Sequence, residues 1–316
     1  MVMKEIDCLI IGDILLDVFY KNENKKSALV RGGTSYCNSA KIEFGGAGNV
    51  ASALSILGAR AYFIGKAGDD LWGRLYNKDL KNKGVKTRVL FEEGATTGIS
   101  FVVLGKNGER SFQVFKGAND ALTIDEIDRM RNLIMKSEYL FFSGYSLAAS
   151  STIDTICYAV NLAKENNVKI VFDPGAHNLI RSNFSLFNKL MYLSDVFCPN
   201  VSEAKAMTQT NSLNVTIRKF KERAELTAIK CGAGGCFLIN QKKCIKIPAF
   251  KTDCEDTTGA GDAFDAALIF GLINNMPLET TGQFANWFAA KIVQRTGARG
   301  FPAKKEITDF LEKTRV

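Results

Sequence analysis

Short apolar runs alternate with stretches of helical periodicity along most of this chain. The predicted strands are Cys8–Ile11, Tyr62–Ile64, Tyr139–Phe142, Lys169–Phe172, Val196–Cys198, Thr227–Lys230 and Cys236–Ile239. The predicted helices between them include Ala47–Leu57, Leu71–Lys83, Thr152–Asn166 and Ile217–Arg223. This alternation predicts an α/β fold in which a mostly parallel sheet carries helices on both faces.

Two stretches near the start of the series break the alternation. Asp17–Phe44 and Thr87–Phe115 resemble extended hairpins, and the second contains alternating apolar residues and the turn Lys106–Glu109. Since both interrupt the same part of the series, we predict that segments of about 17–44 and 87–116 form a small β-sheet lid. The lid would cover the carboxyl ends of the parallel strands, where open α/β sheets bind ligands. The whole chain, 1–316, is predicted to be one domain.

Composition narrows the class of protein. The chain has 316 residues, of which 46% are hydrophobic and 23% charged, as in ordinary globular proteins. It shows no secretion signal and no run of about 18 apolar residues, so we expect no membrane partner. The formal charge of +8 is spread over segments that also contain acids, so nucleic acid is not an expected partner either. The charge would favour an anionic small ligand.

The eight cysteines do not form a metal or disulfide pattern. None of them makes a C-x-x-C pair, and His177 is the only histidine. We therefore expect reduced thiols in a cytoplasmic protein and no zinc site.

The strongest chemical signal is the segment Asp256–Phe264, which reads DTTGAGDAF and leads into a helical pattern. Small residues at Gly259, Ala260 and Gly261 let the backbone approach a ligand, and the N–H groups at the start of a helix attract an anion. Asp262 would lie beside that anion and could accept a proton from an attacking hydroxyl. The pattern predicts phosphoryl transfer; a glycine-rich helix cap with a first-turn acid is the alternative.

This segment resembles the second signature of the ribokinase-like (PfkB) carbohydrate kinase family. The stretch Gly45–Asn49 resembles the first signature, and Asn200 with Glu203 matches a third motif. Seven residues that lie between the first two signatures also follow the family spacing: Gly65, Gly68, Asp69, Gly73, Leu80, Gly84 and Val85. The resemblance covers nearly the full chain and implies a Rossmann-like three-layer fold with a β-sheet lid, and ATP with Mg²⁺ as the phosphate donor.

The resemblance also implies roles for residues of the transfer site. Asp262 matches the family's catalytic base, and Gly259, Ala260 and Gly261 match its anion hole. Asn200 and Glu203 match the pair that organises magnesium, with Glu203 acting partly through water. From the residues alone, a helix cap after Pro199 remains an equal alternative for this pair.

For the acceptor, the resemblance points to a sugar-like molecule. Asp17 lies five residues after Gly12, where the family places a carboxylate that accepts hydroxyl hydrogen bonds, and Gly45, Gly46 and Asn49 would line the opposite side. A solvated Asp17 in a turn is the alternative.

For the nucleotide, the resemblance implies contacts along Cys231–Gly235 and on a late helix. The predicted cofactor-binding residues are Lys230, Gly232, Gly235, Asn286 and Ala290, the last beside Ala289. Asp256 and Thr258, with the turn at Gly297 and Ala298, resemble the family's monovalent cation loop, which makes K⁺ a candidate ion. Glycines after a strand and alanines in a helix also have ordinary structural uses.

The acceptor itself stays open. Asn49 follows Gly46 by three residues, a spacing similar to heptose-phosphate kinases, whereas the opening of DTTGAGDAF and Phe264 are similar to fructokinases and ribokinases. Gly175 follows Asp173–Pro174, where many hexose kinases have asparagine. The lid residues Arg31, Lys41 and Arg110 could bind a phosphate or carboxylate, or could simply be solvated.

Other functions fit less well. The chain contains no P-loop, and Gly45–Gly48 does not have the spacing of a dinucleotide-binding turn. A nucleoside kinase, or a catalytically silent sugar-binding protein on the same fold, remains an alternative. An exposed lid edge could pair two subunits into a homodimer.

Overall fold

A computed structural model describes residues 4–21, 37, 39–104, 110–223 and 225–314. Nine described strands form the main sheet in the order β13-β12-β11-β10-β9-β8-β1-β4-β5. All neighbours from β11 to β5 are parallel, and β12 and β13 join as antiparallel strands. The strands are β1 (Ile6–Ile11), β4 (Ala61–Gly68), β5 (Lys86–Glu92), β8 (Ser137–Ser143), β9 (Lys169–Asp173), β10 (Val196–Phe197), β11 (Leu226–Lys230), β12 (Cys236–Ile239) and β13 (Cys244–Ile247).

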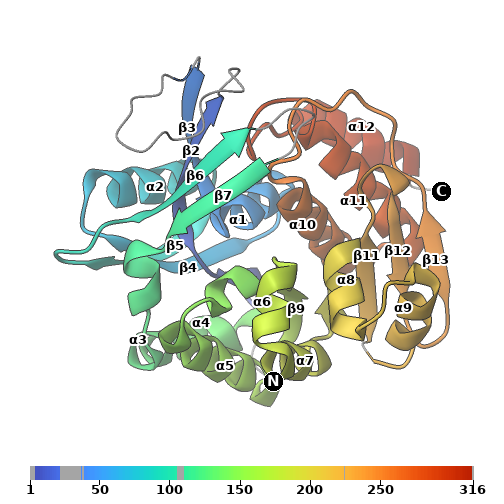
Figure 1. The fold of residues 1–316 in the computed structure, drawn as a ribbon, viewed down its shortest axis with the longest axis horizontal. Coiled ribbons are helices and arrows are strands. Elements are labelled where there is room, and N and C mark those ends of the chain that lie inside the picture. The colour runs from blue at the N-terminus through green and yellow to red at the C-terminus, as the bar shows by residue number, and fades with distance from the viewer. Residues whose placement is uncertain (1–3, 22–36, 38, 105–109, 224, 315–316) are drawn as a thin grey trace.

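Helices cover both faces of this sheet (Figure 1). Alternate residues of β1 enter different cores, with Cys8 and Ile10 in one and Leu9 and Ile11 in the other. One face packs against α1 (Gly48–Ile56), α2 (Leu71–Asn82), α10 (Ala260–Ile273), α11 (Leu278–Ile292) and α12 (Lys304–Thr314). The other face packs against α3 (Ile124–Arg129), α4 (Arg131–Met135), α5 (Ser150–Glu165), α6 (His177–Ser182), α7 (Phe184–Leu193), α8 (Val201–Thr208) and α9 (Leu213–Phe220). The three-layer prediction is confirmed.

A separate four-stranded sheet forms the lid, in the order β3-β2-β6-β7. It contains β2 (Ile14–Lys21), β3 (Ser39–Gly46), β6 (Gly98–Leu104) and β7 (Arg110–Phe115). The strands β2 and β3 pair antiparallel, as do β6 and β7, while β2 and β6 pair parallel. Because only Gly12 and Asp13 separate β2 from β1, the lid is joined directly to the end of a central strand.

The predicted lid boundaries need a correction. The first part of the predicted segment 87–116 forms β5, which pairs with β4 at the edge of the main sheet, so the second lid segment starts at Gly98. The first lid segment starts slightly earlier than predicted, at Ile14. The predicted turn at 106–109 and Arg31 lie outside the described residues.

Most predicted elements match within a few residues, but one strand was not predicted and one helix is displaced. The strand β13 has no counterpart in the prediction, and α9 begins at Leu213 and ends at Phe220 where Ile217–Arg223 was predicted. The eight cysteines are free thiols. Among the described helices, none is long and apolar enough to cross a membrane.

Candidate phosphoryl-transfer site

The helix α10 begins at a backbone turn that only glycine adopts readily. Gly259 is its N-cap, with φ 75° and ψ 0°, and a Cβ at this position would come within 2.5 Å of Ala298 Cβ. The turn therefore packs tightly against the segment that precedes α12. Ala260 and Gly261 occupy the first helical positions, where backbone N–H groups have no partner within the helix. This end of α10 has the polarity that favours an anion.

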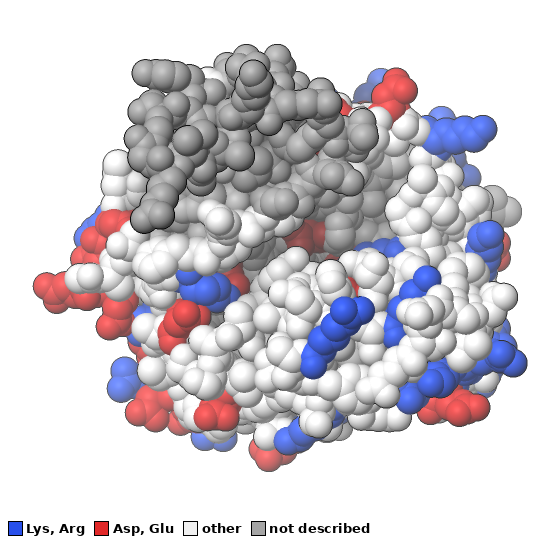
Figure 2. Space-filling model, viewed as in Figure 1, with Lys and Arg blue, Asp and Glu red and all other residues white. Residues whose placement is uncertain are grey.

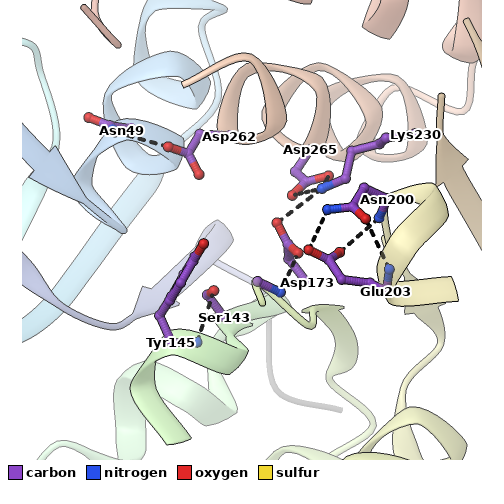
Figure 3. A network of polar contacts seen from close by, with 10 residues as sticks. Asn49, Ser143, Tyr145, Asp173, Asn200, Glu203, Lys230, Asp262 and Asp265 are labelled. Carbon is purple, nitrogen blue, oxygen red and sulfur yellow. Dashed lines mark hydrogen bonds and ion pairs between the residues drawn. The ribbon is translucent and has the colours of Figure 1, made fainter. Parts of the chain in front are cut away.

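Asp262 lies in the first turn of α10 and is bound to the neighbouring helix. The Asn49 Nδ2 group of α1 donates a hydrogen bond to Asp262 Oδ2 over 2.9 Å (Figure 3). Desolvation raises the pKa of Asp262 to about 6, and the Asn49 hydrogen bond partly offsets this effect. A carboxylate with this pKa is ionised at neutral pH and is a stronger base than a solvated aspartate.

Asp17 projects from the lid strand β2 toward the same region. It is 8% exposed, and it lies opposite Ser100 of β6 and Glu43 of β3 in the lid register. Desolvation, together with the nearby charge of Asp262, raises the pKa of Asp17 to about 7. A Cβ on Gly45 would lie only 2.0 Å from Asp17 Oδ2, so this glycine permits the carboxylate to lie against the backbone. The solvated turn considered for Asp17 is therefore wrong.

Gly46 and Asn49 complete this side of the region. Gly46 has φ 70°, and a Cβ there would lie 2.3 Å from the Asp13 carbonyl oxygen. The turn thus holds the start of α1 against the junction between β1 and β2. This packing brings together the four predicted acceptor residues Asp17, Gly45, Gly46 and Asn49.

A second group of charged side chains lies at the ends of β9 and β11. Lys230 Nζ contacts Asp173 Oδ2 at 3.0 Å and both Asp265 oxygens at 3.1 Å (Figure 3). Desolvation alone would lower the pKa of Lys230, but Asp173 and Asp265 raise it well above its usual value. Lys230 therefore remains a cation inside this group.

Asn200 and Glu203 form a reciprocal cap at the start of α8, next to that group. Asn200 N–H donates to Glu203 Oε2 over 2.8 Å, and Glu203 N–H donates to Asn200 Oδ1 over 3.0 Å. Glu203 is 3% exposed, and desolvation followed by the charge of Asp173 raises its pKa to about 7. Asn200 and Glu203 therefore do form a helix cap, and this cap also places Glu203 beside the group of Lys230, Asp173 and Asp265.

These carboxylates suit a hard cation. Glu203, Asp173 and Asp265 outnumber Lys230 in a buried region, and oxygen is the ligand that Mg²⁺ prefers. Among the described residues, no group of three or more side chains is arranged to enclose a metal by itself. Such a site fits an ion that keeps several waters and shares its coordination with phosphate oxygens.

The predicted nucleotide residues fall into two kinds. Gly232 has φ 54° and an added Cβ there would meet nothing within 4 Å, so it lies in an open turn, and Ala290 is partly exposed on α11. Gly235 packs tightly, since a Cβ would lie 2.0 Å from the Ile247 carbonyl oxygen. Asn286 donates to the Ile247 and Pro248 carbonyls over 3.2 and 3.0 Å, so its amide anchors the chain after β13.

The Asp256 carboxylate ties two segments together. One oxygen accepts from Thr258 N–H and Oγ1 over 2.9 and 2.7 Å, and the other accepts from Gly297 N–H over 2.9 Å. The predicted cation loop therefore does bring the segments at 256–258 and 297–298 together. A cation there would depend mainly on backbone carbonyl oxygens.

Several residues of the site were missed in the sequence. Asp265 and Asp173 follow a helix start and a strand end, so a search for carboxylates on the same sheet edge could have found them. Tyr145 is 52% exposed, and its hydroxyl points toward Asp262 (Figure 3). Arg299 donates to Asn49 Oδ1 over 2.8 Å. Tyr145 lies in the short 3-10 helix Gly144–Leu147 and Arg299 in the turn before α12, and no spacing pattern marks either residue.

The two groups of side chains face a common hollow. Figure 2 shows the hollow near the middle of one face of the molecule, with acidic atoms at its bottom. Asn49 and Asp262 lie together, and Asp173, Lys230 and Glu203 lie on the side of α8 (Figure 3). Asp17 is close enough to Asp262 for their charges to interact. A helix start with the polarity that favours an anion and a desolvated carboxylate beside it are the features that phosphoryl transfer requires.

Comparisons with known proteins identify the family. The model of the pfkB family carbohydrate kinases matches residues 5–305, so the chain belongs to this family. It is therefore a carbohydrate kinase of the ribokinase and fructokinase type.

Individual relatives agree with this assignment. Fructokinase-1 of Zea mays is 29% identical over 290 residues, which cover 86% of this chain and 89% of the relative. The structure of an uncharacterized sugar kinase from Pyrococcus horikoshii in complex with ATP has a TM-score of 0.81 and 27% identity, and the match covers 95% of this chain and 96% of that one. A candidate ribokinase II from E. coli, in complex with ATP and Mg²⁺, has a TM-score of 0.85 at 22% identity, covering 98% and 99% of the two chains; this likeness concerns the fold alone.

Proposed function

We propose that this protein transfers the γ-phosphoryl group of ATP to a hydroxyl of a small, uncharged sugar, with Asp262 as the catalytic base. The observation that carries the proposal is the position of Asp262, a desolvated carboxylate in the first turn of α10, directly after the Gly259–Gly261 turn. The base and the anion-binding helix start are thus built from one segment.

The donor side is proposed as follows. ATP would lie with its phosphates between the start of α10 and the cap of α8, and its base over the turn that contains Gly232. Lys230, held by Asp173 and Asp265, would face the phosphates, while Glu203 would bind Mg²⁺ partly through water. Bound Mg²⁺ would neutralise charge on the phosphates. The presence of ATP in the Pyrococcus structure supports this choice of donor. K⁺ at the Asp256 loop belongs to the same proposal.

In the proposed step the acceptor hydroxyl attacks the γ-phosphorus of ATP. The acceptor oxygen forms a bond to the γ-phosphorus, the bond from that phosphorus to the ADP oxygen breaks, and the hydroxyl proton moves to Asp262. The N–H groups at Gly259, Ala260 and Gly261 stabilise the charge on the transferred group. Closure of the lid strands over the acceptor would exclude water, which otherwise competes for the phosphoryl group.

The charges on the lid side favour an uncharged acceptor. Lys116 lies against Asp13, Arg299 against Asp79 and Lys41 against Glu43, so each of these cations already has a carboxylate partner. Asp17 adds a further carboxylate. Among the described side chains, a sugar phosphate or sugar acid would have to compete with these carboxylates for a cation, whereas a polyol can donate hydroxyl hydrogen bonds to Asp17. This balance favours a free sugar over the heptose-phosphate alternative.

Tyr145 keeps a nucleoside acceptor as the second candidate. Its ring is half exposed at the hollow, and a nucleobase could stack on such a surface. The ring also lies against Gly175, where a Cβ would come within 2.8 Å of Tyr145 Cδ2. An asparagine at this position would therefore conflict with the present placement of the ring.

A panel of acceptors tests the proposal. We would measure ADP formation with Mg²⁺ for free sugars, sugar phosphates, sugar acids and nucleosides, using wild type, Asp262→Asn and Asp309→Asn. Asp309 is exposed on α12 and serves as the matched control. We expect turnover with free sugars, a loss of about 10²-fold or more in Asp262→Asn, and no change in the control.

Each other outcome has a definite meaning. Turnover with nucleosides alone would replace the proposed acceptor by the second candidate, and preference for sugar phosphates would contradict the charge argument. Measurable sugar binding without turnover would indicate a silent sugar-binding protein. An Asp262→Asn variant as active as wild type would remove Asp262 from the proton transfer.

A further inference from the structure

Asn49 has two charged neighbours that fix the direction of its amide. Arg299 Nε–H donates to Asn49 Oδ1 over 2.8 Å, and Asn49 Nδ2 donates to Asp262 Oδ2 over 2.9 Å. A guanidinium can only donate and a carboxylate can only accept, so the amide satisfies both partners in one orientation alone. Rotation of the amide by 180° would place Oδ1 against the Asp262 carboxylate, which is unfavourable.

Arg299 is itself held firmly. Its Nη1 group pairs with Asp79 of α2, and its side chain is 10% exposed. The guanidinium carbon lies 5.3 Å from the ring centroid of Tyr76 and 5.9 Å from that of Phe44. These contacts come from α2 and from the lid strand β3, so two elements of the fold fix the guanidinium plane.

We propose that Arg299 is a positioning residue that holds the Asn49 amide, and through it the Asp262 carboxylate, in the orientation required for proton transfer. The inference rests on the proposed function, since it assumes that Asp262 is the base. It assigns a further task to the turn that packs against Gly259 and is tied to Asp256 through the Gly297 N–H group. Hydrogen bonds to charged groups are strong and directional, which suits a side chain that must hold another at a fixed angle.

Kinetics of Arg299→Lys and Arg299→Gln test the inference. Neither side chain reproduces the rigid fork that reaches Asp79 and Asn49 together, so we expect kcat to fall about tenfold or more in both variants. The acceptor KM should change much less than kcat. Arg295→Gln is the matched control, because Arg295 is an exposed arginine of the same segment. The control should keep wild-type kinetics.

The pH dependence of kcat separates the effect of the positive charge of Arg299 from the effect of its hydrogen-bond geometry. Groups that surround Asp262 come from several elements: Asp17 on β2, Asn49 on α1, Tyr145 in the turn after β8, Asp173 on β9, Lys230 on β11 and Arg299 before α12. Since Arg299 lowers the pKa of Asp262, its loss should raise that pKa and move the acid limb of kcat upward by about half a pH unit. The limb should move in Arg299→Gln and stay near wild type in Arg299→Lys.

A measurement without turnover tests the coupling between Arg299 and Asp262 independently of the proposed function. In protein labelled with ¹³C at the aspartate carboxyls, Asp262→Asn identifies the Asp262 signal, and its titration gives the pKa directly. We expect a higher pKa in Arg299→Gln than in wild type or Arg295→Gln. If wild type has no acceptor-dependent turnover, the kinase proposal fails while this titration still tests the contact between the two residues.

The outcomes that overturn the inference are specific. A folded Arg299→Gln variant with kcat within twofold of wild type, or with lower stability as its only defect, would leave Arg299 with a purely structural role. If Arg299→Gln does not fold, Asp79→Asn weakens the anchor with little change of shape and should lower kcat in the same direction. An unchanged kcat in folded Asp79→Asn would then contradict the inference.

Discussion

The residues of the candidate site combine burial with an excess of negative charge. Asp17, Asp262 and Glu203 have pKa values raised to about 7, 6 and 7, and desolvation is the largest cause for each. The raised pKa values mean that ionising these carboxyl groups costs free energy in the unliganded protein, since the charged forms are poorly solvated. Hydroxyl donors and a divalent cation would supply the missing solvation. Perturbed carboxylates grouped at one hollow are typical of functional sites.

Asp17 gives a pH dependence to acceptor binding. In its proposed role Asp17 accepts hydroxyl hydrogen bonds as a carboxylate, so the acceptor KM should rise as the pH falls through about 7, by up to about tenfold per pH unit. In Asp17→Asn, KM should be high throughout and no longer follow this titration, while the KM for ATP stays nearly unchanged. Steady-state kinetics from about pH 5.5 to about pH 8.5 measure both constants. Equal weakening of ATP and acceptor would contradict the placement of Asp17.

The Asp17 carboxyl group should also make the stability of the protein depend on pH. The folded-state pKa of about 7 lies above the value of 3.8 expected in the unfolded chain, so stability is lost as the pH rises from about 4 to 7. Asp17→Asn should therefore be more stable than wild type at pH 8, by about 2 kcal/mol, and the difference should shrink toward pH 5. Thermal unfolding at the two pH values measures it, with Asp309→Asn as control. A variant that is less stable at pH 8 would argue against a desolvated Asp17.

Residue types and spacing predicted some site residues better than others. Asp262 was predictable as a candidate because it lies in a glycine-rich segment that leads into a helical pattern, and Asn49 was predictable as a candidate through the resemblance of Gly45–Asn49 to a family signature. Arg299 was not, because its contacts to Asn49 and Asp79 span 250 and 220 positions of the chain. Such contacts depend on the packing of α1, α2 and the last turn before α12, which no local pattern encodes.

Among the strands, periodicity predicted the buried ones and misassigned an edge. The central strands β1, β8 and β9 are apolar on both faces, which marks them as members of a covered parallel sheet. The strand β5 mixes exposed, partly buried and buried residues because it is the last strand of that sheet. A lid hairpin has the same mixture, so the sequence alone does not separate the two. The edge strand β13 has only four residues, which is too short for periodicity to mark it as a strand.

The turn at Gly259 fixes the position of the N–H groups at the start of α10. Gly259→Ala forces a Cβ into the left-handed region and toward Ala298, so the start of α10 must shift. We expect a loss of stability of about 1–2 kcal/mol or more, and a fall in kcat of about tenfold or more because the N–H groups move. Gly58→Ala is the control, since Gly58 has φ 96° and nothing within 4 Å of an added Cβ.

Comparison of the two variants separates backbone strain from displacement. Gly58→Ala should lose about 1 kcal/mol and keep full activity, because only the left-handed conformation is penalised there. Urea unfolding and steady-state kinetics measure the two effects. If Gly259→Ala shows the same small loss of stability and normal kcat, the close contact with Ala298 does not define the anion-binding turn.

In the molecule as a whole, the two faces of the lid sheet differ in character. Asp17 and Ser100 lie on one face and point into the site. On the other face, Val18 pairs in register with Ile42 on one side and Phe101 on the other. Ile42 is 52% exposed and Phe101 is 40% exposed, so this row of apolar side chains crosses three strands near the surface. Contiguous exposed apolar rows on a sheet favour association.

We expect this face to pair with the same face of a second copy, since a self-complementary apolar row suits a two-fold interface. Sedimentation velocity from about 1 to about 100 µM should show a dimer that Phe101→Ser shifts toward monomer. Tyr192→Ser on α7 is the control, because Tyr192 is also exposed, at 53%, but lies far from the lid in the fold. A wild type that stays monomeric over the whole range, or a Phe101→Ser variant as dimeric as wild type, would contradict pairing through the lid. The strands of this face also carry Asp17, the proposed acceptor ligand. Loss of the dimer should therefore also raise the acceptor KM.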